Sequence, residues 1–207
     1  MTTVHPLPRP SSQAWDGDPP HRQAARSRLI EAAARCVVRD GLAASGISAV
    51  AAEAGVSRPT VYRYFDDRHA LILATLLHAG GELGRDLADH LRAVASPRRM
   101  AVEAMLYVLE EVPRNPLLHA MWSSTALDAD MLADFTGPDV VAMSKQALAR
   151  LIDAAGWSDA EADEAVETML RMLLSLLVAP APKRDADALR TYLHRRLIPA
   201  LGIEETT

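Results

Sequence analysis

The stretch "AGVSRPTVYRYF", residues 54–65, holds two arginines and three aromatic residues, although only 4% of the chain is aromatic. Gly55 favours a turn because glycine readily adopts positive φ. Ser57 stands where the N-cap of a helix belongs. Proline is tolerated in the first helical turn, where backbone N–H groups have no intrahelical partner. Pro59 therefore indicates that a helix begins here.

The helix predicted from this stretch has two different faces. At roughly 100° per residue, Val61 and Phe65 share one face, and Pro59, Tyr62 and Arg63 occupy the opposite one. We expect the first face to pack into a core. The second face is aromatic and basic and is left to contact something else.

The preceding residues predict two further helices, over 22–40 and 47–54. Ile47, Val50, Ala51 and Ala54 recur at the spacing of a single buried stripe. A short helix, a glycine turn and a second short helix with a polar outer face are typical of a helix-turn-helix, whose second helix enters the major groove of DNA. By periodicity alone, an ordinary helical corner explains the pattern about as well.

The wider pattern is more specific. "LIEAAARCVVRDG" followed by "ISAVAAEAGVSRPTVYRYFDDRHAL" resembles the DNA-binding domain of the TetR family of transcriptional regulators, over about residues 26–75. The rest of the chain resembles that family only in being helical and of suitable length.

The resemblance implies a role in DNA binding for residues of the second and third helices and for the start of the fourth. Arg58, Pro59 and Thr60 would begin the groove-facing helix, and Arg63 and Tyr64 would reach bases or backbone. Phosphate or backbone contacts would come from Ser48, Tyr62 and Arg68. Arginine also suits a bidentate contact with guanine on chemical grounds, so Arg58 or Arg63 is the candidate for reading a base.

Two positions depart from the family pattern. Gly46 stands where threonine is frequent, so a cap or phosphate contact is missing, and Ser45 is the residue placed to compensate. Val37 replaces a usual phenylalanine, which should change only the packing. Cys36, the single cysteine, lies on an apolar stripe, and we expect a buried, inert thiol.

Charge is distributed unevenly along the chain. The net charge is −5, but residues 1–70 carry nine basic and seven acidic residues, so the acidic excess lies downstream. Neither an apolar run long enough to span a membrane nor a secretory signal is evident, so we expect a cytoplasmic protein with no membrane partner.

The fold class predicted is all-α, with an N-terminal three-helix helix-turn-helix domain and a larger helical ligand-binding and dimerisation domain. Alanine and leucine dominate, and no strand pattern is present. We expect a disordered arm at 1–20, the helix-turn-helix domain at 21–66 and the larger domain at 67–203. A long helix should start near Asp67, with Gly80 and Gly81 as possible kinks. Further helices are predicted over 98–112, 116–124, 138–155, 159–179 and 185–198.

The helix predicted over 159–179 begins with a capping box formed by Ser158 and Glu161. From Met169 to Val178 it is apolar almost all round, so it must be covered on several sides. A second subunit would cover one side, and the resemblance implies a homodimer through the last two helices. The alternative is a central helix of a monomer.

The middle of the chain is rich in methionine and aromatic residues, which suit a flexible apolar pocket. The resemblance implies a small-molecule effector between these helices, and few charges on their inner faces favour an apolar one. The candidate ligand-binding residues are Met105, Leu109, Met121, Trp122, Phe135, Met143, Met169 and Leu173, each of which also suits plain core packing.

We expect no enzyme, no cofactor and no metal site. The seven histidines are scattered, and neither a glycine-rich phosphate loop nor a nucleophile elbow is present. The predicted function is a ligand-responsive transcriptional regulator, a repressor that binds a palindromic operator as a dimer and is released by an effector. The alternative is a helical adaptor without a DNA-binding role.

Overall fold

The computed structural model describes residues 19–122, 129–179 and 184–203. These residues form helices α1 to α11, with no β-strand among them, which confirms the predicted all-α class. The predicted disordered arm falls largely on residues 1–18 and so lies outside the described part of the chain. Across the three described segments, no helix is both long and apolar enough to cross a membrane.

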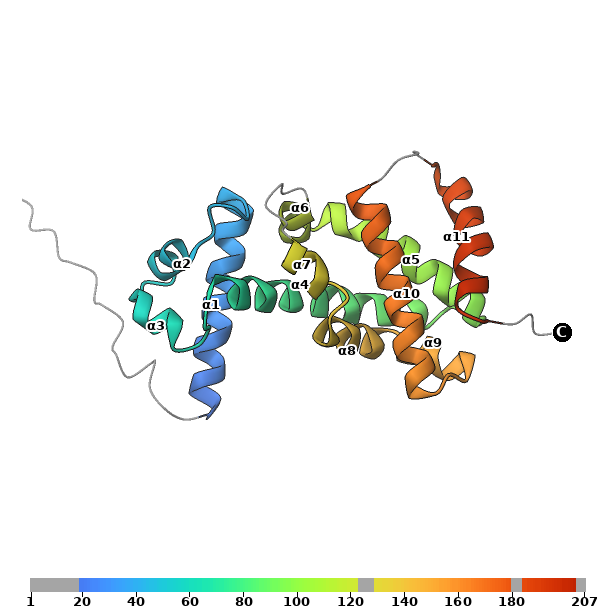
Figure 1. Ribbon diagram of the computed structural model, residues 1–207, viewed down its shortest axis with the longest axis horizontal. Helices are drawn as coiled ribbons and strands as arrows, with labels where there is room; N and C mark the ends of the chain where they lie inside the picture. Colours follow the sequence, from blue (N-terminus) through green and yellow to red (C-terminus); the bar gives the residue numbers. More distant parts are fainter. Residues whose placement is uncertain (1–18, 123–128, 180–183, 204–207) are drawn as a thin grey trace, which may run out of the picture.

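The head of the molecule consists of α1 (Pro19–Asp40), α2 (Ile47–Glu53) and α3 (Arg58–Tyr62), at the left end in Figure 1. Its core contains Leu29, Val50, Val61 and Phe65, and the buried Leu71 from the next helix packs into the same cluster. Cys36 belongs to this core and is fully buried, as predicted. Burial raises the pKa of its thiol, which keeps the sulfur protonated and unreactive.

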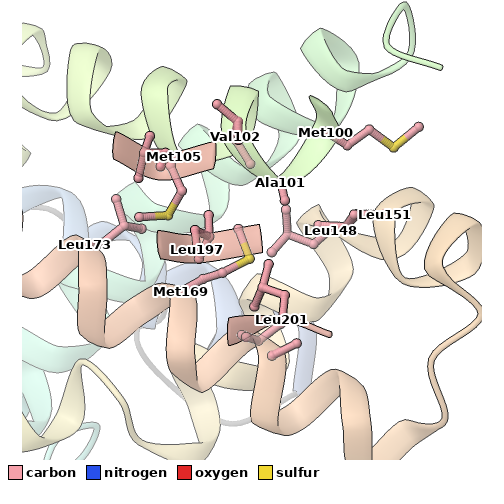
Figure 2. Close-up of a cluster of buried hydrophobic side chains, with 14 of the residues drawn as sticks. Met100, Ala101, Val102, Met105, Leu148, Leu151, Met169, Leu173, Leu197 and Leu201 are labelled. Carbon is pink, nitrogen blue, oxygen red and sulfur yellow. The ribbon is translucent and has the colours of Figure 1, made fainter. Parts of the chain in front are cut away.

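A long helix, α4 (Arg68–Leu91), connects the head to the helical body (Figure 1). The body consists of α5 (Pro97–Arg114), α6 (Pro116–Trp122), α7 (Ala129–Asp134), α8 (Pro138–Ala147), α9 (Ala149–Ala155), α10 (Asp159–Val178) and α11 (Ala186–Ala200). Figure 2 shows its core, where Met105 of α5, Met169 and Leu173 of α10, and Leu197 of α11 converge.

Side-chain caps begin several of these helices, and those of α3 and α10 were predicted from the sequence. Ser57 accepts a hydrogen bond from the backbone N–H of Thr60 at the start of α3. Asp67 and Asp185 do the same for α4 and α11. The capping box of Ser158 and Glu161 is present at the start of α10, and the hydrogen bonds from Ser158 lower the pKa of the Glu161 carboxyl.

The single helix predicted over 138–155 is wrong. Leu148 leaves helical geometry, with φ −100° and ψ 10°, and separates α8 from α9. Its side chain is buried in the body core. Beyond the break, the Arg150 guanidinium donates to the carbonyl oxygen of Arg92 at 2.7 Å. The break therefore lies where the chain packs into the body core and contacts the end of α4.

Two other elements differ from expectation. Helix α7 lies in a segment where no helix was predicted. Helix α3 ends at Tyr62 and is followed by a turn, in which the N–H groups of Tyr64 and Phe65 both donate to the Val61 carbonyl.

The glycines of α4 allow another helix to approach closely, and α4 runs through them without a break. A Cβ placed on Gly80 would lie 2.8 Å from Cε of Met143, and one on Gly84 would lie 3.2 Å from Cβ of Ala147. Helix α8 therefore packs on a surface of α4 that only glycine leaves open. Gly81, in contrast, faces open space.

Candidate functional site

The position of α3 is set by two buried side chains, Val61 and Phe65, which anchor it in the head core. Ser57 and Thr60 share a hydrogen bond between their hydroxyl oxygens at 2.9 Å, which fixes the first turn. Gly55 has φ +69° and turns the chain between α2 and α3, as predicted from its lack of a Cβ.

The opposite face of α3 is exposed. Arg58, Pro59 and Arg63 lie on this face, and the side chain of Tyr62 is 47% exposed although it is large and aromatic. Ser48 of α2 is exposed as well. The two-faced helix predicted from periodicity is thus confirmed, and we call these five residues the α3 surface.

The remaining residues predicted to contact DNA are less exposed. Thr60 is half-buried with its hydroxyl engaged by Ser57, and Tyr64 is half-buried against the head core. Arg68 donates to the carbonyl oxygen of Leu42 at 2.6 Å. Since a guanidinium has five N–H donors, this bond holds Arg68 in place while leaving donors for a phosphate.

Ser45 does not replace the missing cap of α2, so that expectation was wrong. Its hydroxyl is buried and donates to the Gly41 carbonyl at 2.8 Å. Gly46 occupies the N-cap position, where no side-chain hydrogen bond is made. The hydroxyl instead stabilises the turn after α1, because a buried O–H needs an acceptor and the Gly41 carbonyl is within reach.

An ion-pair clamp joins α1 to α2. The Glu53 carboxylate lies 2.7 Å from Nε of Arg35 and 2.7 Å from Nη1 of Arg39. Hydrogen bonds from these two guanidinium groups lower the pKa of Glu53. The clamp fixes α2 against α1 and so sets the orientation of the helix-turn-helix as a unit.

A second candidate site is a cavity of about 110 Å³ inside the body, enclosed by side chains of α4, α5, α6, α8 and α10 and by Phe135. Of the eight residues predicted to bind a ligand, the cavity brings together six: Met105, Trp122, Phe135, Met143, Met169 and Leu173. The rings of Trp122 and Phe135 meet edge to face, with centroids 4.7 Å apart.

The other two candidates lie elsewhere. Leu109 packs against the body core without lining the cavity. Met121 is buried among Val37, Leu42 and Ile72, at the boundary with the head. Sequence reasoning missed the walls formed by Gly80 and Gly84, because a glycine pair in a helix suggests a kink before it suggests a close contact.

Helices α6 and α7 contact both the cavity and the head. Leu118 and Trp122 of α6 line the cavity, whereas Met121 packs on the head-side cluster. Met131 of α7 joins the same head-side cluster, and Phe135, directly after α7, lines the cavity. These two short helices therefore lie between the two candidate sites.

A polar contact reinforces this junction. Nε2 of His69, in the first turn of α4, lies 2.5 Å from Oδ2 of Asp134, the last residue of α7. His69 follows Arg68, which contacts the head. Asp134 precedes Phe135, which lines the cavity. The contact therefore joins a residue next to the head to a residue next to the cavity.

Comparisons with known proteins agree with this architecture. Residues 29–75 match the family described as bacterial regulatory proteins, tetR family. An uncharacterised helix-turn-helix-type transcriptional regulator of Mycobacterium tuberculosis, Rv1255c, is 28% identical over 176 residues, which is 84% of each chain.

Two solved structures share the fold. A TetR transcriptional regulator from Rhodococcus sp. RHA1 is similar with a TM-score of 0.64 and 23% identity, covering 87% of this chain and 97% of that one. RolR, solved in complex with resorcinol, is similar with a TM-score of 0.66 and 16% identity, covering 92% and 97%.

The matched segment and the fold together define the class, a helix-turn-helix transcriptional regulator. The N-terminal domain is of the tetR family type, since the matched residues 29–75 contain the whole of α2 and α3.

Proposed function

We propose that the protein is a repressor that binds a palindromic operator as a homodimer and is released by a small apolar effector. The observation that carries this proposal is the α3 surface. Two arginines and a 47% exposed tyrosine are held away from the core by the buried Val61 and Phe65. Such a surface suits the major groove, where arginine reads guanine, with flanking groups on phosphates.

Residues 21–66 would act as the DNA-binding domain and 67–203 as the effector-binding and dimerisation domain. The first turns of α4 belong physically to both, since Leu71 packs in the head core while the far end of the helix packs in the body.

The homodimer is supported by the apolar surface of α10 and α11. Val178 is 52% exposed, and Met172, Leu176, Leu189 and Tyr192 are only partly buried. A second copy that covered these side chains would remove them from water. It would also place two α3 helices for two half-sites, about 34–36 Å apart for adjacent turns of DNA.

The effector would bind in the 110 Å³ cavity, which has no charged side chain in its lining. Binding changes DNA affinity only if the effector prefers one of two conformations. Helices α6 and α7 are suited to this coupling, because a ligand that moved Trp122 or Phe135 would also move Met121 and Met131 against the head. RolR, the structural neighbour solved with resorcinol, is consistent with a ligand site in this fold.

The test is a mobility-shift assay with DNA from upstream of the protein's own gene, over a series of salt concentrations. We expect tight binding to one palindromic fragment and a steep loss of affinity with salt, because phosphate contacts release counterions. A scrambled fragment of equal length is the control. Equal affinity for both fragments would contradict operator binding, and no affinity for either would favour a helical adaptor.

The effector is tested by a thermal-shift screen followed by release of the bound fragment. We expect apolar compounds to raise the melting temperature and to dissociate the DNA complex. Stabilisation by strongly polar compounds alone would contradict an apolar effector.

A further inference from the structure

The cavity contains few groups able to form hydrogen bonds. Among the side chains that line it, only Ser144 and Trp122 carry an O–H or N–H group. Within the described part of the chain, neither group has a hydrogen-bond partner. Each is therefore available to an oxygen atom of a ligand.

The rest of the lining favours an aromatic ligand. Three methionines, Met105, Met143 and Met169, contribute thioethers to the wall, and sulfur makes favourable contacts with aromatic rings. Trp122 and Phe135 are already arranged edge to face, a geometry that a third ring can extend.

The volume of the cavity suits a ligand of about one ring. Its volume is about 110 Å³, and an engineered apolar cavity of roughly 150 Å³ holds a benzene molecule. A smaller residue on α4 cannot widen the cavity at this point, because Gly80 already has no side chain. A Cβ placed on Gly80 would lie too close to Cε of Met143.

We infer that the effector is an uncharged, single-ring aromatic molecule with one hydroxyl group, about the size of phenol. The ring lies among the three methionines, Trp122 and Phe135, and the hydroxyl oxygen accepts a hydrogen bond from Ser144. This inference rests on the proposed role of the cavity as the effector site.

The experiment measures binding of four probes to the full-length protein by calorimetry at pH 7. Phenol has both features, toluene lacks the hydroxyl, cyclohexanol lacks the aromatic ring, and benzoate carries a charge. We expect phenol to bind most tightly, toluene and cyclohexanol more weakly, and benzoate not at all.

Two variants locate the hydrogen bond. Ser144→Ala should weaken phenol binding about 2- to 10-fold, the range for loss of one hydrogen bond, and leave toluene binding unchanged. Ser175→Ala, which alters an exposed serine of α10, is the matched control and should change neither. Trp122→Phe keeps a ring while removing the indole N–H, and should weaken phenol binding less than Ser144→Ala.

The outcomes separate this inference from the proposed function. Equal binding of toluene and phenol, with no effect of Ser144→Ala, would overturn the inference and leave an apolar effector site intact. Tightest binding of benzoate would overturn both the inference and the apolar cavity. If an apolar compound of another shape binds and releases DNA while phenol does neither, only the inference fails.

Discussion

Arg63 illustrates what a single residue contributes to the α3 surface. It follows the last helical residue of α3 and acts as its C-cap, with its guanidinium carbon 5.9 Å from the centre of the Tyr64 ring. Tyr64 in turn packs on the head core. The Arg63 side chain therefore lies beside Tyr64, whose own position is fixed by its packing on the head core.

We predict that Arg63→Ala lowers operator affinity by ~1–3 kcal/mol, because a bidentate contact with guanine would be lost. Binding to random DNA of the same length should change much less. Fluorescence anisotropy with both DNA fragments measures the difference. Arg85→Ala, at an exposed position of α4 away from the head, is the control and should have no effect. An equal loss on both DNA fragments would show that Arg63 contacts only phosphates.

At this scale the sequence predicts burial well and hydrogen-bond partners poorly. Val61, Phe65 and Cys36 are buried because helical spacing alone places them on inner faces. Ser45 bonds to Gly41, and Arg68 bonds to Leu42. Those acceptors come from a turn whose path the side-chain pattern does not specify.

Between elements, the Glu53 clamp is a contact that depends on pH. The folded state lowers the pKa of Glu53 below its ordinary value of 4.5. The clamp therefore contributes stability above that value and loses it as the pH falls through the lowered pKa.

We predict that Glu53→Gln reduces the melting temperature at pH 7 and that the difference from the unmodified protein shrinks as the pH falls below 4.5. Glutamine keeps the shape while removing the charge that Arg35 and Arg39 contact. Glu31→Gln, at an exposed position of α1, should show no comparable difference. A difference for Glu53→Gln that persisted unchanged at low pH would mean that the carboxylate charge is unimportant.

The adjacent glycines of α4 provide a matched pair of variants. Gly81→Ala should stabilise the protein by ~0.5–1 kcal/mol, because alanine favours a helix and the added methyl group meets nothing within 4 Å. Gly80→Ala should stabilise the protein less, or destabilise it, because its Cβ would lie 2.8 Å from Cε of Met143. Chemical denaturation measures both values. Equal stabilisation by the two changes would refute the close packing of α8 on α4.

The helices were predictable where caps and strong periodicity mark them, as in α10 with its capping box. The break at Leu148 was not, because neither glycine nor proline marks it. Helix α7 is six residues long, too short for an apolar period to repeat.

At the scale of the whole molecule, the proposed dimer interface of α10 and α11 can be tested directly. We predict that Val178→Glu shifts the protein from dimer to monomer, weakening association at least about tenfold, because two-fold symmetry would bring two new charges together. Val38→Glu is the control, since Val38 is similarly exposed, at 49% against 52%, but lies on the head. Sedimentation velocity distinguishes the two states. A Val178→Glu protein that remained dimeric would place the interface elsewhere.

The cavity was only partly predictable, for a reason that belongs to the whole chain. Methionine and aromatic content identified five lining residues besides Leu173, but Met121 has the same chemistry and faces the head instead. Which side of α6 faces the cavity is decided by how the body packs on the head, and no local pattern records that arrangement.

The two-sided packing of α6 also has an evolutionary consequence. A substitution on α6 that adapted the protein to a new compound would also disturb the contact between Met121 and Val37, and so would alter DNA affinity in the absence of any ligand. Changes at Met143 of α8 or Met169 of α10 carry no such penalty, since neither residue belongs to the head-side cluster. New ligand specificities should therefore arise first through substitutions on α8 and α10. The lining residues of α6 should diverge most slowly.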